Sequence, residues 1–426
     1  MAENPAPTRP IKPVVAEAAV LKLADILGEP GELRQLRQRA WRYYNDAPLP
    51  SRVAHLWKYT DPADLLPAEI VVPSGPSAVG PVAALEDAAV AVILRPGVQP
   101  MLTVSPEAER AGVRVRPIGD AEMDHHLVGA AVSPEHGLFE ALNTAMFGSS
   151  AAIYIPSGVK LDGPIHVVAT AAQAANLPRL LIHAGTRSEA TIIEEHAGGG
   201  EDRFVVGVSE VFVEAQAQVR HVLLERLDGG TAAHLSMRGH VRRDGNLLAV
   251  VASFGGGKTK VDLGGVLLES GARSEIVGFV LGQSRQHFDH HTLHDHRAPH
   301  TTSNIDFKVA LNDRARSAYT GLIRIAKDAP GAEAYQENRN LLLSSKCRAD
   351  TIPELEILTD DVRCTHGATV APIDAEQLFY LRSRGLAEEA GRRLIVRGFL
   401  EKALVRLPAS LRQRVETALE ERLGAL

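Results

Sequence analysis

The stretch Ala184-Gly-Thr-Arg-Ser-Glu-Ala-Thr-Ile-Ile193 decides the fold, because its order of turn, polar residues and β-branched strand recurs along the chain. Related phrases begin at Glu214, Arg243 and Ser270, at intervals of about 30, 29 and 27 residues, and the pattern returns at Asn312. A fixed period of this length is typical of a solenoid, whose repeats bury their apolar faces against one another. Since the repeats contain strands and no helix, they favour a parallel β-helix over a β-sandwich, which requires no fixed period.

The composition agrees with a narrow, stacked interior. The chain has 426 residues, of which 45% are hydrophobic but only 4% are aromatic, and it contains 36 glycines. Small aliphatic side chains fill a narrow coil, whereas bulky rings fit it poorly. The formal net charge of −6 argues against a basic nucleic-acid-binding surface. Two cysteines in so long a chain exclude a disulfide scaffold and suit a reducing compartment.

Changes of pattern divide the chain into four segments. Residues 1–14 are rich in proline and are expected to form a disordered arm, and residues 15–149 mix helical and strand patterns. Residues 150–372 carry the repeats, with a helix conceivable only near residues 331–343, and residues 373–426 are helical. The expected fold class is mainly β, with a β-helix core between an N-terminal α/β domain and C-terminal helices. Without a signal-peptide pattern or a membrane-length apolar run, we expect a cytoplasmic protein.

The C-terminal helices carry a wide apolar stripe. The helical pattern from Ala387 to Leu407 places apolar residues along one face: Leu394, Ile395, Phe399, Leu400, Ala403, Leu404 and Leu407. Such a stripe serves equally well as a docking face for a partner protein or as a cap over the chain's own β-helix. The residues alone leave both uses open.

A glycine-rich loop, Ala252-Ser-Phe-Gly-Gly-Gly-Lys-Thr259, loosely resembles a phosphate-binding loop. Such a loop needs a helix behind it, because the helix N-terminus supplies the N–H donors and a favourable dipole. The residues that follow, Val261-Asp-Leu-Gly-Gly-Val-Leu-Leu268, have the pattern of a strand. A turn between two coils is therefore the better interpretation, and no nucleotide-binding residue is assigned.

The densest group of polar residues is Gln286-His-Phe-Asp-His-His-Thr-Leu-His-Asp-His-Arg-Ala-Pro-His300. Alternate residues of a strand share a face. One face would then hold His290, Thr292, His294 and His296, and the other Asp289, His291 and Asp295. Stacked imidazoles and carboxylates can bind a transition metal, so the segment from His287 to His300 is a candidate metalloenzyme centre. Hydrogen bonding to the neighbouring coil is the interpretation that we favour for histidines in a regular β array.

A second candidate site surrounds one of the two cysteines. Cys364 and His366 stand two positions apart in a strand-like segment, so they share a face. A neighbouring imidazole promotes thiolate formation, and a Cys/His pair can ligate iron or a soft metal. A cysteine that only packs is the alternative. The chain has no Ser-His-Asp order, His-Glu-x-x-His or Cys-x-x-Cys motif, and therefore no self-contained catalytic signature.

Several segments together resemble the SufB/SufD family of iron–sulfur cluster assembly scaffolds. The segment from Asp360 to Val370, followed by Ile373 to Gly385, is similar to the C-terminal signature of SufD-type members, and Trp57-Lys-Tyr-Thr60 resembles the family's N-terminal signature. The family's central block is resembled by His290–His296, Ser303–Asn304, Lys308 and Tyr319–Ile323. These segments follow the family's order from near residue 40 to the C-terminus.

The resemblance implies a right-handed parallel β-helix in a cytosolic complex with a SufB-like paralogue and a SufC-like ABC-type ATPase. It implies that the C-terminal helices bind the ATPase, which gives the stripe of Phe399, Leu400, Ala403 and Leu404 a docking role. It also implies that the last coils pair with the paralogue and that iron or a transient iron–sulfur cluster forms near that interface. His366 is then the first candidate ligand and Cys364 the second.

Cys347 is the third candidate ligand. The segment Cys347-Arg-Ala-Asp-Thr-Ile-Pro-Glu-Leu-Glu356 is similar to the part of SufB that carries a cluster-building cysteine, but the SufB-type strand with Glu-His-Glu-Ala-Thr is absent. A SufD-like, non-catalytic scaffold is therefore expected, with a SufB-like or homodimeric scaffold as the alternative and a β-helix enzyme acting on polysaccharide as the less favoured one. Whether a flavin binds stays open at this stage.

Overall fold

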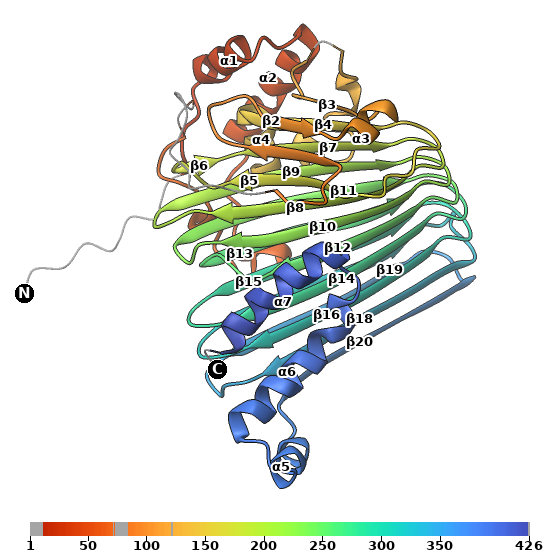
Figure 1. Ribbon diagram of the computed structural model, residues 1–426. Helices are drawn as coiled ribbons and strands as arrows, with labels where there is room; N and C mark the ends of the chain where they lie inside the picture. Colours follow the sequence, from red (N-terminus) through yellow and green to blue (C-terminus); the bar gives the residue numbers. More distant parts are fainter. Residues whose placement is uncertain (1–11, 71, 73–83, 121, 425–426) are drawn as a thin grey trace, which may run out of the picture.

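The chain forms a flattened parallel β-helix with helices at its N-terminal end and along one side (Figure 1). The computed structural model describes residues 12–70, 72, 84–120 and 122–424. Successive strands alternate between two sheets, here called A and B, so that each coil contributes one strand to each sheet. The parallel β-helix predicted from the repeat is therefore confirmed.

The two sheets have the following strands in spatial order. Sheet A contains β2 (Met101–Val104), β1 (Val90–Leu94), β5 (Ile165–Thr170), β8 (Glu189–Gly198), β10 (Gln218–Leu227), β12 (Asn246–Ser253), β14 (Arg273–Gly282), β16 (Thr302–Leu311), β18 (Ala332–Leu342) and β20 (Val362–Pro372). Sheet B contains β19 (Arg348–Ile357), β17 (Arg316–Ile325), β15 (His287–His296), β13 (Lys258–Leu267), β11 (Thr231–Val241), β9 (Arg203–Val213), β7 (Pro178–Ala184), β4 (Ser149–Ile155) and β3 (Arg114–Arg116), with β6 (Ala175–Asn176) beside β9.

The turns that lead from sheet B to sheet A explain the repeat. Successive coils place one residue with a positive φ at an equivalent position: Arg187, Gln216, Asp244, Gly271, His300 and Gly331. The N–H of Arg187 donates to the carbonyl of Ala215 at 3.0 Å, and that of Gln216 donates to the carbonyl of Arg243 at 2.8 Å. Each acceptor directly precedes the positive-φ residue of the next coil, so the turns are hydrogen-bonded in register. The phrase at Asn312 lies at the opposite edge, between β16 and β17, and does not belong to this series.

The segment near residues 331–343 is a strand, so the expectation that it could be helical is wrong. In β18, buried residues alternate with more exposed ones over Ala332–Asn340, which is the two-residue period of a strand. The strand pairs in parallel with both β16 and β20. Because several of its buried positions hold polar side chains, the two-residue period is not visible in the pattern of apolar residues.

The N-terminal residues fold against the first coils. The helices here are α1 (Glu17–Ile26), α2 (Gly31–Asp46), α3 (Pro106–Arg110), α4 (Leu138–Met146) and the short 3-10 segments η1 (His55–Trp57), η2 (Pro62–Leu65), η3 (His125–Leu127) and η4 (Pro134–His136). Lys12 Nζ donates to the carbonyls of Asn45 (3.0 Å) and Ala47 (2.7 Å) at the end of α2, so residues 12–14 of the predicted disordered arm are anchored. Residues 1–11 lie outside the described residues. β1 pairs in parallel with β5, and the β-helix therefore begins before residue 150.

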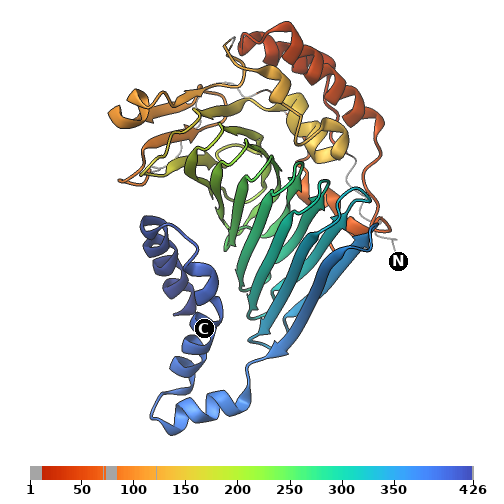
Figure 2. The same cartoon turned by 90° about the vertical axis from the view of Figure 1, so that its right-hand side faces the viewer.

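Two of the C-terminal helices, α6 and α7, lie along the outer face of sheet A (Figure 2). After α5 (Ala375–Ser383), helices α6 (Glu388–Leu404) and α7 (Ala409–Leu423) bury apolar residues against outward-facing residues of β10, β12 and β14. Leu400 is 0% exposed, and Ala403 and Leu404 are each 1% exposed. In this conformation the apolar stripe is therefore a cap on the chain's own sheet, and of the four predicted docking residues only Phe399 stays partly exposed.

In the part of the chain that the structure describes, no helix has both the length and the apolar character needed to cross a membrane.

Replacing Leu400 by Ala should lower the free energy of unfolding by about 2–5 kcal/mol, because it leaves a cavity between α6 and sheet A. The matched control is Leu394→Ala on the same helix, where the residue is 50% exposed and the change should stay within about 0.5 kcal/mol. Chemical denaturation followed by circular dichroism measures both. Equal, small losses would contradict the packing of α6 on sheet A.

Candidate functional site at the open end of the β-helix

The two ends of the β-helix are finished differently. At the N-terminal end the outermost strands are the short β2 and β3, which pair antiparallel to β1 and β4. At the C-terminal end the outermost strands are β19 and β20, of 10 and 11 residues, and no strand of the described residues pairs with their outer edges. Long, unpaired strand edges are usually covered by another chain, because their N–H and C=O groups otherwise lack partners.

Apolar side chains are also exposed at this end. Ile357 is 38% exposed, Leu358 57% and Val370 44%, all on β19, on β20 or in the turn between them. Most other long strands of the β-helix are largely buried, whereas most residues of β20 are exposed. Exposed apolar side chains beside free strand edges are typical of an interface with another protein. We call this surface, made by β19 and β20, the open end.

Cys364 and His366 lie on β20 at the open end and share its inward face. Cys364 is opposite Ala334, and His366 is opposite Gln336, in the parallel register with β18. Cys364 is half-buried against the small apolar cluster of the last coil, and this burial raises the pKa of its thiol. His366 is exposed. The pair offers one thiol and one imidazole, a donor set that suits iron, at a position that a second chain could reach.

Cys347 is not brought to this pair. It lies in the turn after β18, is 8% exposed, and its thiol donates to the carbonyl of Ser344 at 2.8 Å. Cys364 lies opposite Ala334 at the start of β18, whereas Cys347 follows the end of that strand. The step of eight residues from Ala334 to Leu342 corresponds to about 26 Å of strand at a rise of about 3.3 Å per residue. Within one chain, Cys347 and Cys364 therefore cannot ligate the same ion.

The histidine-rich strand β15 has the two faces expected from its sequence. On the inward face, His294 is hydrogen-bonded to Ser274 at 3.0 Å and His290 to Ser253 at 3.0 Å, both across the interior. Burial lowers the pKa of His290 and His294 to about 3, so both imidazoles are neutral. Each of these inward histidines is bonded to a neighbouring coil through Nε2, as the favoured interpretation had it, whereas Nδ1 of both has no hydrogen-bond partner among the described residues.

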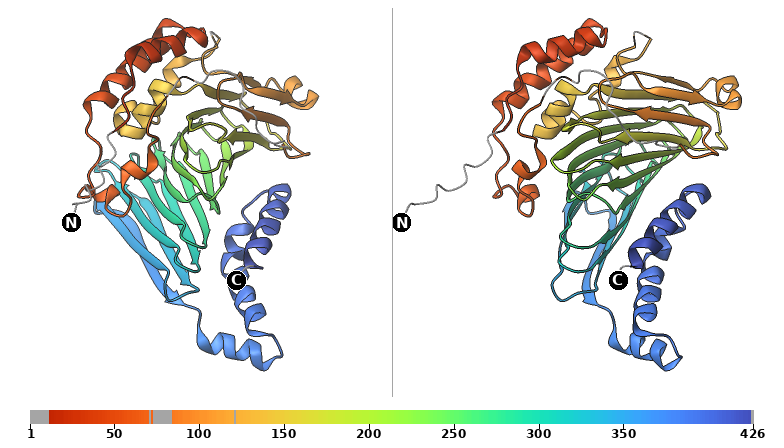
Figure 3. Two further views of the ribbon diagram at one scale, coloured as in Figure 1. Left: turned by 90° about the vertical axis from the view of Figure 1, so that its left-hand side faces the viewer. Right: turned by 60° about the vertical axis from the view of Figure 1, so that its left-hand side comes forward.

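The outward face of β15 belongs to a network that sequence reasoning missed. Lys260 Nζ donates to Asp289 Oδ2 at 3.0 Å and to the carbonyl of Leu56 at 2.8 Å. Thr60 donates to the same carboxylate oxygen at 2.6 Å, and Lys260 Nζ also lies 4.8 Å from the centre of the Trp57 ring. Figure 3 shows the segment around η1 and η2 lying against sheet B. The motif Trp57-Lys-Tyr-Thr60 was the available signal, and its role here is to attach the N-terminal segment to the β-helix.

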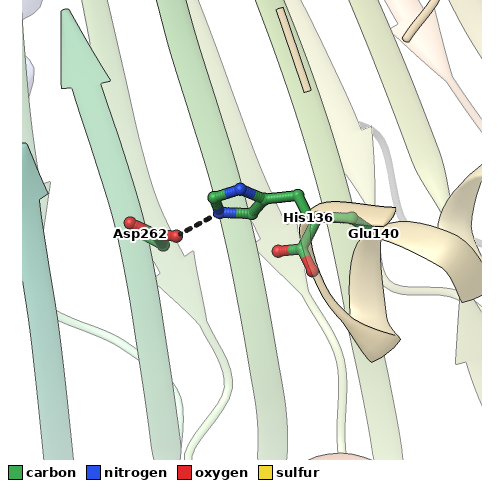
Figure 4. Close-up of side chains that lie close together, drawn as sticks. All are labelled: His136, Glu140 and Asp262. Atoms are coloured by element: carbon green, nitrogen blue, oxygen red, sulfur yellow. Dashed lines mark hydrogen bonds and ion pairs between the residues drawn. The ribbon is translucent and has the colours of Figure 1, made fainter. Parts of the chain in front are cut away.

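One group of three side chains in the described residues has the spacing of a metal site. Ligand atoms of His136, Glu140 and Asp262 lie within 4.8 Å of one another (Figure 4). Each already has a protein partner: His136 Nε2 lies 3.1 Å from Asp262 Oδ2, Arg238 donates to Asp262 Oδ1 at 2.9 Å, and Ser236 donates to Glu140. The guanidinium of Arg238 thus already occupies the carboxylate of Asp262, which a metal ion would need as a ligand. The group therefore fits an ion-pair network that holds η4 and α4 on sheet B.

The glycine-rich loop between β12 and β13 is no phosphate cradle. The N–H of Gly256 donates to the carbonyl of Leu227 at 2.8 Å, and that of Gly257 donates to the carbonyl of Thr231 at 2.7 Å. The N–H of Gly255 donates to Glu225. Strand β13 follows directly, so a helix N-terminus is absent and the loop's own donors are already used. The interpretation as a turn between coils is confirmed.

Glu225, which accepts that bond, is a buried carboxyl inside the β-helix. Burial raises its pKa from 4.5 to about 7, although the N–H groups of Leu227 and Gly255 partly oppose the shift. Because the folded-state pKa is raised, the stability that protonated Glu225 contributes is complete below pH 4.5 and is lost as the pH rises through 7.

Glu225→Gln should therefore remove a pH dependence of stability of about 3 kcal/mol at most. We expect the wild-type free energy of unfolding to fall relative to that of Glu225→Gln between pH 5 and pH 8, measured by urea denaturation. Glu401→Gln, at an exposed position of α6, is the matched control and should follow the wild-type curve. Parallel curves for wild type and Glu225→Gln would contradict the raised pKa.

Comparison of the sequence with known proteins identifies the family of this chain. Residues 167–399 match the family model described as the SUF system FeS cluster assembly SufBD core domain. An iron–sulfur cluster assembly SufBD family protein of Synechocystis is 31% identical over 293 residues, which cover 65% of this chain and 64% of that protein. A SufBD family protein of Mycobacterium leprae is 29% identical over 330 residues, covering 74% of this chain and 82% of the relative. In Staphylococcus epidermidis, such a protein is 28% identical over 291 residues, or 67% and 63% of the two chains.

The matched region contains the coils from β5 onward, the open end and most of α6. The match spans less than two thirds of the Synechocystis protein's own length. The family model covers more than half of the chain, and the relatives agree with it. This protein, a parallel β-helix with an open C-terminal end, belongs to the SufBD family of iron–sulfur cluster assembly proteins.

Proposed function

We propose that this chain is a SufD-like, non-catalytic scaffold subunit that takes part in iron acquisition and builds a transient iron–sulfur cluster at its open end, together with a SufB-like β-helix chain. The observation that carries the proposal is the open end itself, where two long strands each have an unpaired outer edge and one of them, β20, carries Cys364 and His366. A second β-helix chain would satisfy these strand edges by continuing the sheets. The cluster is the cargo of the complex and not a resident group of this chain.

The donor count supports a shared site. Cys364 and His366 supply two ligand side chains, whereas a whole iron–sulfur cluster is commonly held by four protein ligands. The remaining ligands would then come from the partner chain. If the two chains pair about a two-fold axis perpendicular to the sheets, the side of the open end near Cys364 meets the side of the partner that corresponds to Cys347. Cys347, at the other edge, would in that arrangement face the partner's strand.

His366→Ala should reduce cluster formation at least about tenfold in the complex that is co-expressed with the paralogue and the ATPase, because it removes an exposed donor. The measurement is anaerobic purification, with iron and sulfide analysis and visible absorption of the same complex. His126→Ala removes another exposed histidine far from the open end in the sequence and should leave the yield within about twofold.

Two further variants sharpen this test. Cys364→Ser should lower the yield less than His366→Ala, since the cysteine is half-buried and its thiol pKa is raised. If Cys347→Ser lowers the yield of cluster as much as His366→Ala does, the result would favour the two-fold arrangement. Unchanged yield in His366→Ala with an intact complex would refute the role of this histidine, and failure of the paralogue to co-purify would refute the scaffold pairing.

We also propose that the C-terminal helices bind a SufC-like ATPase, which hydrolyses the ATP that the complex uses. Since Leu400, Ala403 and Leu404 are buried in the chain, docking would use the other side of these helices. A groove of about 800 Å³ lies there between α5, α6 and the end of sheet A. Tyr380, Leu394 and Phe399 line it. Of the four residues predicted to dock the ATPase, Phe399 is therefore the one that can still reach a partner.

Leu394→Asp should abolish co-purification of the ATPase, because it places a charge in an exposed apolar groove without disturbing the packing of α6 on sheet A. Val405→Asp is the matched control, since Val405 is similarly exposed, at 49%, but does not line the groove. Retention of the ATPase by Leu394→Asp would exclude the groove as its docking site. Equal loss in both variants would indicate a general effect of charge.

A further inference from the structure

A basic cleft, separate from the open end, lies where the η1–η2 segment meets the edge of sheet B. Its volume is about 440 Å³, within the range of small-molecule sites. Five cationic side chains line it: Arg52, Lys258, Arg285, Arg314 and Arg316. Two carboxylates, Asp61 and Asp64, are the acidic residues of the lining. The cleft thus has an excess of positive charge in a chain whose formal net charge is −6.

The register of sheet B places three of the lining residues side by side. Lys258 is opposite His287, and His287 is opposite Arg316, at the starts of β13, β15 and β17. Adjacent strands lie about 4.8 Å apart, so this is a continuous ladder of basic side chains. Burial lowers the pKa of the central His287, so Lys258 and Arg316 on either side of it carry the positive charge of this ladder.

The turns beside this ladder add two more guanidinium groups in equivalent positions. Arg285 follows Ser284, with a φ of 56°, and Arg314 follows Asp313, with a φ of 53°. The N–H of Arg314 donates to the carbonyl of Ser284 at 2.9 Å, which holds the two turns in register. The stacking that builds the β-helix therefore also aligns Arg285 with Arg314.

Most of this positive charge is not neutralised by the protein. Lys258 Nζ lies 2.6 Å from Asp64 Oδ2. For the guanidinium groups of Arg285, Arg314 and Arg316, no carboxylate within ion-pair distance occurs among the described residues. Guanidinium groups that converge on a cleft without being paired to a carboxylate are what recognition of an anion requires.

His287 gives the cleft a fixed polar wall. Thr60 donates its proton to Asp289 Oδ2, so its contact of 2.8 Å with His287 Nε2 requires a proton on that nitrogen. Asp289 is in turn bound by Lys260 at 3.0 Å. This chain of contacts fixes the orientation of His287 and of the Thr60 segment before any ligand arrives.

We infer that this cleft binds a small polyanion that carries at least two phosphate or carboxylate groups. The guanidinium groups of Arg285, Arg314 and Arg316 would contact the charged groups, and the segment from Tyr59 to Asp61 would form the opposite wall. The neighbouring glycine-rich loop takes no part through its backbone, because its N–H groups already have carbonyl or carboxylate partners. The volume of about 440 Å³ suits a small ligand better than an acidic protein segment.

The test is isothermal titration calorimetry of the full-length chain with pyrophosphate and, separately, with citrate. Saturable binding with a dissociation constant of about 1 mM or tighter is expected for at least one of them at about 150 mM salt. Comparison of the two probes distinguishes a phosphate ligand from a carboxylate ligand. Arg314→Gln combined with Arg316→Gln should weaken that binding roughly tenfold or more.

The matched control combines Arg243→Gln with Arg273→Gln, which removes the same charge from exposed positions at the opposite edge. It should change the affinity by about twofold at most. If the cleft variant loses its fold by circular dichroism, Arg285→Gln replaces it. No saturable binding of either probe, equal weakening in the control, or binding of poly-glutamate without binding of the small anions would each overturn the assignment.

Discussion

The structure depends on one constraint, the pairing of strand backbones between neighbouring coils. Each strand of the β-helix satisfies its N–H and C=O groups only through the coils on either side, and the turns are tied together in the same way. At the N-terminal end the short antiparallel strands β2 and β3 bring the stack to a close. At the other end β19 and β20 keep one long unpaired edge each, within the described residues. This asymmetry is the reason for proposing that a partner chain covers the C-terminal end.

The remaining surfaces are largely occupied by the chain itself. Helices α6 and α7 cover much of the outer face of sheet A, and the N-terminal helices with the η1–η2 segment cover part of sheet B. Under the η1–η2 segment, Lys260 and Asp289 are paired with each other. At the open end and at the edge of sheet B, His366 and the arginines of the basic cleft are exposed and Cys364 is half-buried, so the proposed sites lie there.

Sequence reasoning correctly predicted the features that follow from a periodic pattern of residues. It did not predict which residues from different segments lie close together. The repeat predicted the β-helix, and alternation assigned the two faces of β15 correctly. Alternation also placed Cys364 and His366 together, since they belong to one strand. It could not place Cys347, because only the register between β18 and β20 shows that about 26 Å of strand separates the two cysteines. Likewise, the stripe around Leu400 has the same pattern whether it covers its own sheet or a partner.

By itself, the sequence determined the solenoid, its period and the family, because these follow from the spacing of turns, from small aliphatic side chains and from local motifs. Tertiary structure alone decided which end of the stack is open and which face of α6 is buried. It also decided which basic residues converge: Lys258, His287 and Arg316 are some 29 residues apart along the chain and become neighbours only through the strand register. The reason is physical, since charges and ligands act through distances in space, and in a parallel β-helix the register between coils sets those distances.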